Sequence, residues 1–151
     1  MNYGTLSLTN CVIENNQAIG GHGSDDSGSG AGGGPGGGVT GGGIYSAGPL
    51  TLHQCTVANN TSQGGSEGYS DNFGNGGGSA SGGAIYSETE LVVHASVFTN
   101  NQAIGGSGQA DGSEGGAAYG GGIWAYNSFV VTASTISSNS ARGGGQTYGG
   151  G

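Results

Sequence analysis

The sequence predicts an all-β protein, a parallel β-helix (β-solenoid) of about four coils that carries long glycine-rich lateral inserts. Three observations predict this class. A phrase of alternating apolar and small polar residues recurs four times, no segment shows the period of a helix, and glycine accounts for 40 of the 151 residues. Alternation is typical of a half-buried strand, and a repeat that cannot bury its own apolar face must stack on its neighbours.

The composition excludes several classes of protein. Hydrophobic residues make up only 32% of the chain and charged residues 7%, which argues against an ordinary globular core and against charge-driven disorder. The net charge is −8 and Arg142 is the only strong base, so nucleic acid is not expected as a partner. No apolar run reaches the ~20 residues of a transmembrane helix, and no secretory signal is visible. Two cysteines make neither a disulfide framework nor a four-ligand zinc site.

The repeated phrases align without gaps and begin 44, 41 and 38 residues apart. They are LSLTNCVIENN from Leu6, LTLHQCTVANN from Leu50, LVVHASVFTNN from Leu91 and FVVTASTISSN from Phe129. Each phrase contains two short strands. In the first strand the inward positions are Leu6, Leu8, Leu50, Leu52, Leu91, Val93, Phe129 and Val131. In the second strand they are Cys11, Ile13, Cys55, Val57, Ser96, Phe98, Ser134 and Ile136. A third short strand precedes the last three phrases, at residues 44–45, 85–86 and 123–124.

Two kinds of side chain recur at equivalent positions and predict ladders along the solenoid. The phrases end in asparagines at one corner, where side-chain amides can hydrogen-bond from coil to coil, and plain turn preference is the alternative. These asparagines are Asn16, Asn60, Asn101 and Asn139. Cys11 and Cys55 align one coil apart and point inward. Directly stacked strands place Cα atoms ~4.8 Å apart, which suits either a disulfide or two buried free thiols.

Two motifs in these phrases resemble those of a known family. The sequence GGAI from Gly82, with its glycine versions that end at Ile44 and Ile123, resembles a Gly-Gly-Ala motif followed by Ile, Leu or Val. Phe98-x-x-Asn101 and its three counterparts resemble a Phe-x-x-Asn motif. Together they are similar to the repeats of polymorphic outer membrane proteins and related bacterial surface proteins. The resemblance implies a right-handed parallel β-helix of the pectin-lyase type, although the long glycine inserts depart from that family's tight connections.

The glycine-rich inserts span residues 20–43, 64–84, 105–122 and 143–151. They are either flexible linkers or polyproline-II helices that run out and back and stack into a thin fin. The first three are 24, 21 and 18 residues long, all multiples of the three residues per polyproline-II turn. We therefore predict ordered inserts laid side by side, with Gly32, Gly33 and Gly34 in polyproline-II conformation before Pro35. The whole chain, residues 1–151, is one solenoid domain, and we expect a piece of a longer protein because it opens inside a repeat.

Aromatic and metal-ligating side chains are the candidate binding residues. Tyr45, Tyr86 and Trp124 align and point outward, where they form either a platform for sugar rings or a ladder that only stabilises the strands. For a metal, the candidates are Asp25 and Asp26 in a glycine loop that resembles a calcium repeat without its period, and His53 and His94 one coil apart. Solubilising charge and surface histidine are the alternatives. We expect no cofactor, with calcium as the alternative. The acids of the inserts are Asp25, Asp26, Glu67, Asp71, Asp111 and Glu114.

No nucleophile–base pair can be assembled, and the strand carboxylates Glu14, Glu88 and Glu90 have no base beside them, so we expect no enzyme. The expected function is a structural or adhesive repeat module of a bacterial cell-surface or extracellular fibrous protein. Its expected partners are further copies, stacked end to end, or a surface or matrix polysaccharide. One alternative is a carbohydrate-binding or carbohydrate-active β-helix that uses the aromatic ladder. A second is ice binding by the outward hydroxyls of Thr5, Ser7, Thr9, Thr51, Thr132 and Thr135, an array interrupted by Glu90, Val92 and the histidines.

Overall fold

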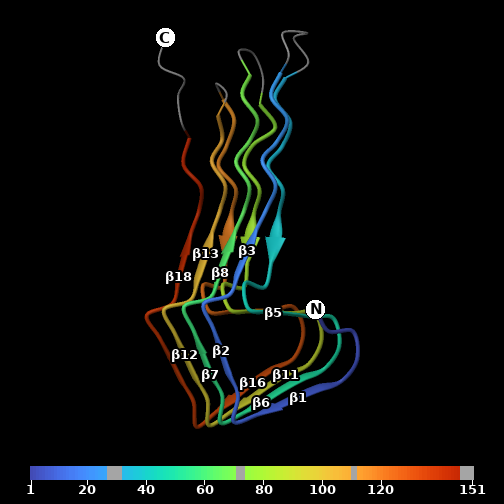
Figure 1. Ribbon diagram of the computed structural model, residues 1–151, viewed down its shortest axis with the longest axis vertical. Helices are drawn as coiled ribbons and strands as arrows, with labels where there is room; N and C mark the ends of the chain where they lie inside the picture. Colours follow the sequence, from blue (N-terminus) through green and yellow to red (C-terminus); the bar gives the residue numbers. More distant parts are fainter. Residues whose placement is uncertain (27–31, 71–73, 110–111, 147–151) are drawn as a thin grey trace.

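In the computed structural model, which describes residues 1–26, 32–70, 74–109 and 112–146, the chain winds into about four coils of a parallel β-solenoid. All the elements of these residues are strands. Figure 1 shows the coils at the bottom of the view and the glycine-rich segments rising from them. Coils stack strand on strand in parallel register, so equivalent residues of the repeat lie side by side. The predicted fold class is confirmed.

Five parallel sheets run along the solenoid, and we number them in the order in which one coil visits them. The first contains β1 (Leu6–Thr9), β6 (Leu50–His53), β11 (Leu91–His94) and β16 (Phe129–Thr132). The second contains β2 (Val12–Glu14), β7 (Thr56–Ala58), β12 (Val97–Thr99) and β17 (Thr135–Ser137). The third contains β3 (Gln17–Ile19), β8 (Thr61–Gln63), β13 (Gln102–Ile104) and β18 (Ser140–Arg142). The fourth contains β4 (Val39–Thr40), β9 (Ala80–Ser81) and β14 (Ala118–Tyr119). The fifth contains β5 (Ile44–Ser46), β10 (Ile85–Ser87) and β15 (Ile123–Ala125).

The prediction of three strands in each coil was therefore incomplete. The third and fourth sheets lie at the base of the glycine-rich segments, and their strands are two or three residues long. Triplets such as Thr61–Gln63 contain no large apolar side chain, so they carry no alternating pattern that sequence reasoning could detect. Part of the predicted first insert, residues 20–43, belongs to the solenoid, because β4 pairs with β9 in register.

Each coil turns at residues with positive φ, which lie in the left-handed region that favours Gly, Asn and Asp. The first corner, before the cysteine or serine of each phrase, has φ between 49° and 53° at Asn10, Gln54, Ala95 and Ala133. The second corner, before the ladder asparagine, has φ between 54° and 57° at Asn15, Asn59, Asn100 and Ser138. The third, after the fourth sheet, is made by Gly41, Gly82 and Gly120.

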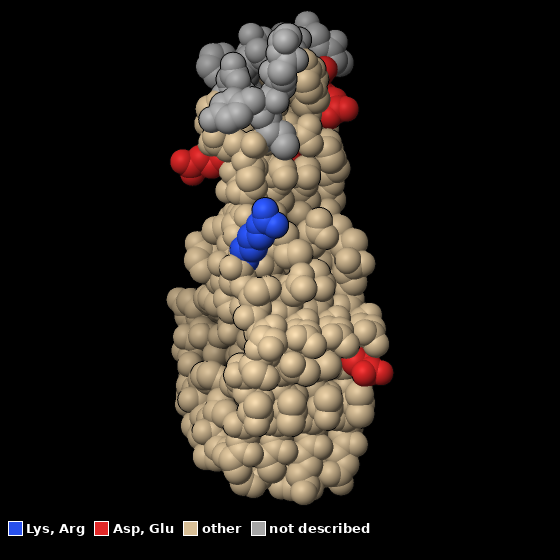
Figure 2. Space-filling model, turned by 90° about the vertical axis from the view of Figure 1, so that its left-hand side faces the viewer, with Lys and Arg blue, Asp and Glu red and all other residues tan. Residues whose placement is uncertain are grey.

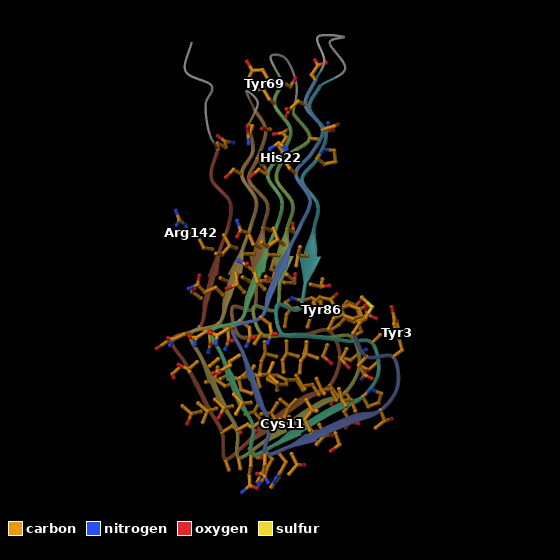
Figure 3. The ribbon with its side chains drawn as sticks, in the orientation of Figure 1. Tyr3, Cys11, His22, Tyr69, Tyr86 and Arg142 are labelled. Carbon is orange, nitrogen blue, oxygen red and sulfur yellow. The ribbon has the colours of Figure 1, made fainter. Side chains whose placement is uncertain are left out.

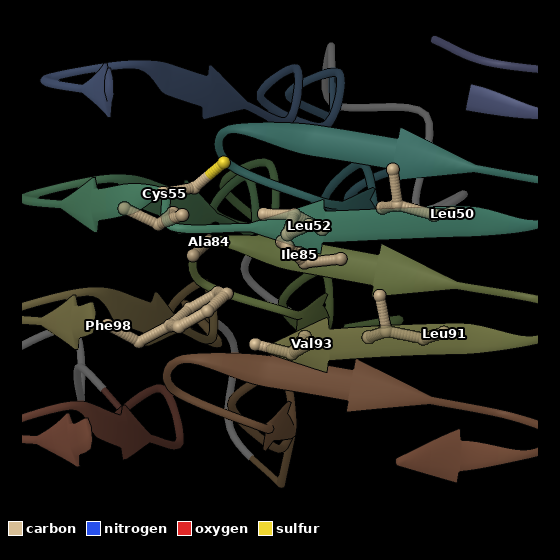
Figure 4. Close-up of a cluster of buried hydrophobic side chains, with 9 residues drawn as sticks. Leu50, Leu52, Cys55, Ala84, Ile85, Leu91, Val93 and Phe98 are labelled. Carbon is tan, nitrogen blue, oxygen red and sulfur yellow. The ribbon is translucent and has the colours of Figure 1, made fainter. Parts of the chain in front are cut away.

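The core is a column of inward side chains that repeats from coil to coil. Leu52 pairs with Val93, and Val93 pairs with Val131, as the alternation of the phrases predicts. In the two middle coils this core is closed, because Leu52, Val93 and Phe98 are all 0% exposed. Figure 4 shows these side chains stacked between successive coils. Burial of an aliphatic or aromatic side chain contributes about 1.5–3 kcal/mol, so this column is the main apolar stabilisation of the solenoid.

The two end coils repeat the register without the burial. Phe129 and Ile136 of the last coil are 43% and 47% exposed, although they occupy the positions of the buried Leu91 and Phe98. Val131 packs against the core and is only partly buried. These residues pair with the inward positions of the preceding coil, as predicted. They are nevertheless exposed, because β16 and β17 are edge strands with no further strand beside them among the described residues.

The glycine-rich segments form a fin that stands on the third and fourth sheets (Figure 1). Each outgoing arm leaves a strand of the third sheet, and each returning arm leads to a strand of the fourth. The outgoing arms are residues 20–26, 64–70, 105–109 and 143–146, and the returning arms are 32–38, 74–79 and 112–117. Figure 2 shows the fin as a narrow column above the wider solenoid.

Backbone hydrogen bonds join the arms with a period of three residues. The amides of Gly20, Gly23 and Asp26 donate to the carbonyls of Gln63, Ser66 and Tyr69 at 2.8–2.9 Å. Outgoing and returning arms are joined in the same way, for example from Gly65 N to Gly37 O at 2.9 Å. Three residues per turn is the period of polyproline-II helices, whose backbone bonds are free to join neighbouring chains. The prediction of inserts laid side by side with bonds between segments is confirmed.

Glycine is required in the fin wherever an arm faces another backbone. A Cβ added at Gly20, Gly64 or Gly105 would lie far inside 3.0 Å of a carbonyl oxygen of a returning arm. The prediction for Gly32 was wrong, because its φ is +83°. Gly76 and Gly112, near the start of the other two returning arms, also have positive φ, of 86° and 77°. Glycine adopts this backbone conformation without a Cβ clash, which explains its use at these three positions.

Candidate functional site

The aromatic ladder on the outer face of the fifth sheet is the most developed candidate site. Tyr45, Tyr86 and Trp124 are paired in register on β5, β10 and β15. The Tyr45 and Tyr86 rings stack with centroids 5.5 Å apart, and the Tyr86 and Trp124 rings with centroids 4.6 Å apart. Both pairs are nearly parallel, with interplanar angles of 8° and 9°. The three rings are half-buried, so they stabilise the stacked strands and still present an aromatic surface to solvent.

Tyr126 extends this surface, which sequence reasoning missed. Its ring lies 5.9 Å from that of Trp124, tilted by 38°, and the residue is 73% exposed. Tyr126 follows β15 in a turn that has no aromatic residue in the other coils, so the repeat alignment offered no signal for it.

A carboxylate stands at the edge of the aromatic ladder. The Tyr45 hydroxyl donates a 2.6 Å hydrogen bond to Glu88 Oε1, and the Asn127 side-chain amide donates to the Glu88 carbonyl, also at 2.6 Å. The hydrogen bond to Glu88, together with desolvation and the charge of that carboxylate, raises the pKa of Tyr45 to about 12. Burial and then the Glu88 charge raise the pKa of Tyr86 as well. Both phenols therefore stay neutral at physiological pH.

A shallow depression of about 330 Å³ lies between these groups, lined by Tyr86, Glu88, Tyr126 and Asn127. Figure 3 places Tyr86 on the solenoid, below the base of the fin. Aromatic faces beside a few hydrogen-bonding groups are the usual lining of small-molecule sites. This arrangement can bind a ligand that has both an apolar face and hydroxyl groups.

The candidate metal ligands do not lie close enough together to form one site. His53 and His94 stack with ring centroids 5.1 Å apart, and His94 Nδ1 lies 2.8 Å from the Thr132 hydroxyl in the next coil. Asp25 lies on the fin, where its Oδ1 accepts a 2.8 Å hydrogen bond from the Tyr69 amide. In the part of the chain that the structure describes, no group of three or more His, Cys, Asp or Glu side chains is placed to hold a metal ion. Asp71 and Asp111 lie outside the described residues.

The two cysteines are neighbours, as their alignment predicts, and both are free thiols. Thr56 N donates to Cys11 O at 2.9 Å, which fixes the two coils in register there. Each thiol is directed toward the carbonyl two residues before it, with Sγ–O distances of 3.4 Å. Ser96 and Ser134 make the equivalent contact in the next coils, at 2.9 and 2.8 Å. This position therefore holds a small side chain whose thiol or hydroxyl can donate to the backbone carbonyl two residues earlier.

The asparagines form the ladder that their spacing predicts. The side-chain amide of each donates to Oδ1 of the next, at 2.9 Å from Asn16 to Asn60, 2.9 Å from Asn60 to Asn101 and 2.8 Å from Asn101 to Asn139. The backbone amides of the first three also donate to the same oxygens. Asn60 and Asn101 are 0% exposed. The ladder provides hydrogen-bond partners for the polar groups at this buried corner. All its bonds between asparagines run from one coil to the following coil, so the two ends of the solenoid differ.

Glu67 is a buried carboxylate inside the fin that sequence reasoning placed among solubilising acids. It is 0% exposed, and Oε2 accepts a 2.8 Å hydrogen bond from the Gln109 amide. Desolvation raises its pKa, but the hydrogen bonds from the Ser113 hydroxyl and nearby backbone amides outweigh it, and the net pKa lies below the ordinary value. Oε1 has no partner of ordinary hydrogen-bond geometry. The period of three could have signalled it, because Glu67 follows Gly64 in a row that faces neighbouring arms.

An open hollow of about 560 Å³ lies at the end of the first coil. Its lining combines inward apolar side chains, among them Leu6, Leu8 and Ile13, with the polar residues Glu14 and Asn16. In the middle coils the equivalent space is filled by the neighbouring coil. The hollow is therefore an end face of the core, and it shares no lining residue with the depression at Tyr86.

No protein-family model, no curated protein and no solved structure matches the chain. Among the described residues, no helix has the length and apolar character needed to cross a membrane.

Proposed function

We propose that the chain is a structural or adhesive repeat module of a bacterial cell-surface or extracellular fibrous protein, and that it is not an enzyme. The observation that supports this proposal most is the continuity of its ladders. Core, asparagine corner, aromatic face and fin all run from coil to coil without a break. We expect such a column to resist both bending and local unfolding. It also holds the fin in a fixed position on the solenoid. The similarity of the repeats to those of polymorphic outer membrane proteins points to the same role.

The cell-surface part of this proposal is tested by locating the protein on intact cells. Antibodies raised against the purified chain are applied to the cells that encode it, before and after permeabilisation. We expect full labelling of intact cells and loss of the signal after brief protease treatment of the cell exterior. Labelling that appears only after permeabilisation would contradict the proposed location.

A second candidate function is carbohydrate binding at the aromatic ladder. The depression between Tyr86, Tyr126 and Glu88 favours it, because a sugar ring has an apolar face for the aromatic rings and hydroxyls for the carboxylate. Retention on a panel of immobilised polysaccharides is compared for the unaltered chain and Tyr86→Ala. The control is Tyr119→Ala, which removes an exposed tyrosine on the fourth sheet. Equal retention of all three proteins would exclude this site, and released oligosaccharides would indicate a carbohydrate-active enzyme.

Ice binding is the least supported function. In the first sheet, the outward positions of one row are Ser7, Thr51, Val92 and Val130, so hydroxyls occupy only the first two coils. His53 and His94 interrupt the neighbouring row between Thr9 and Thr132.

A further inference from the structure

We propose that this chain binds a second copy of itself head to tail, with the last coil of one copy stacked in parallel on the first coil of the next. The inference deepens the proposed structural role and rests on it for its biological meaning. Its physical test is separate from labelling of the cell surface. It is carried by three features of the end coils: their exposed core positions, their matching register and the direction of their hydrogen bonds.

Within the residues that the structure describes, the two end coils expose inward positions that the middle coils bury. The first coil presents the 560 Å³ hollow, lined in part by Leu6, Leu8 and Ile13. The last coil presents Phe129 and Ile136, 43% and 47% exposed where the middle coils bury their equivalents completely. Exposed apolar patches of this kind mark interaction sites, and the flanking strands β1 and β16 leave their outer edges open for pairing.

The two faces match in register. If the repeat continues across the junction, Leu6 of one copy lies on Phe129 of the other, as Leu91 lies on Phe129 within the chain. Ile13 then lies on Ile136, as Phe98 does. Arg142, at the end of β18, falls opposite Ile19 rather than opposite another base. The junction therefore repeats a contact that the chain already makes three times.

Hydrogen bonds give the solenoid a polarity that selects head-to-tail stacking. In the asparagine ladder the donors point toward the last coil, so Asn16 Oδ1 is the acceptor end and Asn139 the donor end. The serine corner has the same direction, since Ser96 N donates to Ser134 Oγ at 3.0 Å. The outgoing arms of the fin agree, because Gly20 N donates to Gln63 O in the next coil.

Only one self-contact satisfies this polarity. Head-to-tail stacking sets the Asn139 donors against the Asn16 acceptor of the next copy. Stacking two first coils would set acceptor against acceptor, and stacking two last coils would set donor against donor. A head-to-tail contact uses two different surfaces, so each bound copy presents a fresh face and the assembly grows along the solenoid axis.

The first test blocks one face at a time with a lysine. Leu6→Lys places a charge on the first coil and Ile136→Lys on the last. The control is Val97→Lys, which removes an exposed valine from the central strand β12 of a middle coil. Mass is measured by sedimentation over the micromolar to millimolar range. We expect the unaltered chain and Val97→Lys to gain mass with concentration, each blocked variant alone to stay monomeric, and an equimolar mixture of the two to form heterodimers.

A monomeric unaltered chain would overturn the proposal, and so would association of either blocked variant alone or a mixture that does not dimerise.

A disulfide trap tests the same contact if a lysine variant does not fold. In a background with Cys11→Ser and Cys55→Ser, which copies Ser96 and Ser134, one protein carries Ser7→Cys and another Val130→Cys. Both positions point outward, and continued register pairs them across the junction. We expect mixed disulfides to dominate, whereas a majority of Ser7→Cys homodimers would overturn the head-to-tail direction.

Discussion

Two alanine substitutions in the fin should have opposite effects on stability. Gly65 lies on the second outgoing arm, where an added Cβ would be far inside 3.0 Å of the Gly21 carbonyl oxygen. Gly21 lies on the first outgoing arm, and a Cβ there would meet nothing within 4 Å. Neither residue has a positive φ, so the substitutions differ in the space available and not in backbone strain.

The magnitude follows from the contacts that Gly65→Ala must break. The new methyl group has to move out to the ordinary 3.4–4 Å contact distance, and both contact partners are backbone. Separating the two arms strains the three hydrogen bonds from Gly20, Gly23 and Asp26, each of which contributes about 0.5–1.5 kcal/mol. We expect Gly65→Ala to cost about 2–4 kcal/mol. Gly21→Ala should stabilise the protein by about 0.4–1 kcal/mol, because alanine reduces the entropy of the unfolded chain.

Urea unfolding, followed by circular dichroism, measures the free energy of unfolding of both variants. Amide hydrogen exchange then locates the loss. In Gly65→Ala the amides of Gly23 and Asp26 should lose protection while that of Leu52 in the core keeps it. Equal stability of the two variants, or unchanged protection of the fin amides in Gly65→Ala, would refute the interpretation of the fin as a close-packed bundle of backbones.

Three further predictions concern the asparagine ladder and two groups with shifted pKa values, Glu67 and Tyr45. Asn101→Ala should cost at least about 2 kcal/mol more than Asn16→Ala in urea unfolding, since Asn101 is fully buried and its loss leaves buried donors and acceptors unpaired. The pKa of Glu67 is lowered by folding, so its stabilisation should be complete above its ordinary pKa of 4.5 and lost as pH falls through the lower folded value. Glu67→Gln should remove that part of the acid dependence of the urea midpoint, and an unchanged dependence would contradict the assignment. The pKa of Tyr45 is raised from 10.0 to about 12, so its neutral form stabilises the fold below pH 10.0, and this contribution is lost as pH rises through about 12. In an absorbance titration of tyrosinate, Glu88→Gln should move one phenol back toward 10.0, and no movement would exclude the hydrogen bond as the cause.

Alternation in the four phrases was sufficient to predict the solenoid and its register. Leu52, Val93 and Val131 lie in one column because strands in a stacked coil must keep one face toward the core, and a shift of one residue would turn every apolar side chain outward. The asparagine ladder was predictable for the same reason, since register places Asn60 beside Asn101 once the coils are stacked.

The candidate site was only partly accessible to such reasoning. The stacking of Tyr45, Tyr86 and Trp124 follows from register, but Tyr126 and Asn127 lie in a turn that the other coils do not share. The hydrogen bond between Tyr45 and Glu88 joins residues of two coils through a side-chain conformation that no repeat pattern specifies.

Local sequence determined which residues form strands of the core, where the chain turns, and that glycine fills the inserts, because each of these depends on one residue and its neighbours along the chain. The tertiary structure alone decided the third and fourth sheets, the burial of Glu67 and which glycines of the fin are enclosed. These depend on which backbone lies opposite which. Gly65 is buried and Gly21 is exposed, although both stand in the same kind of glycine run. The difference arises because Gly65 lies on an inner arm, with neighbouring arms on both sides, whereas Gly21 lies on the first arm of the fin.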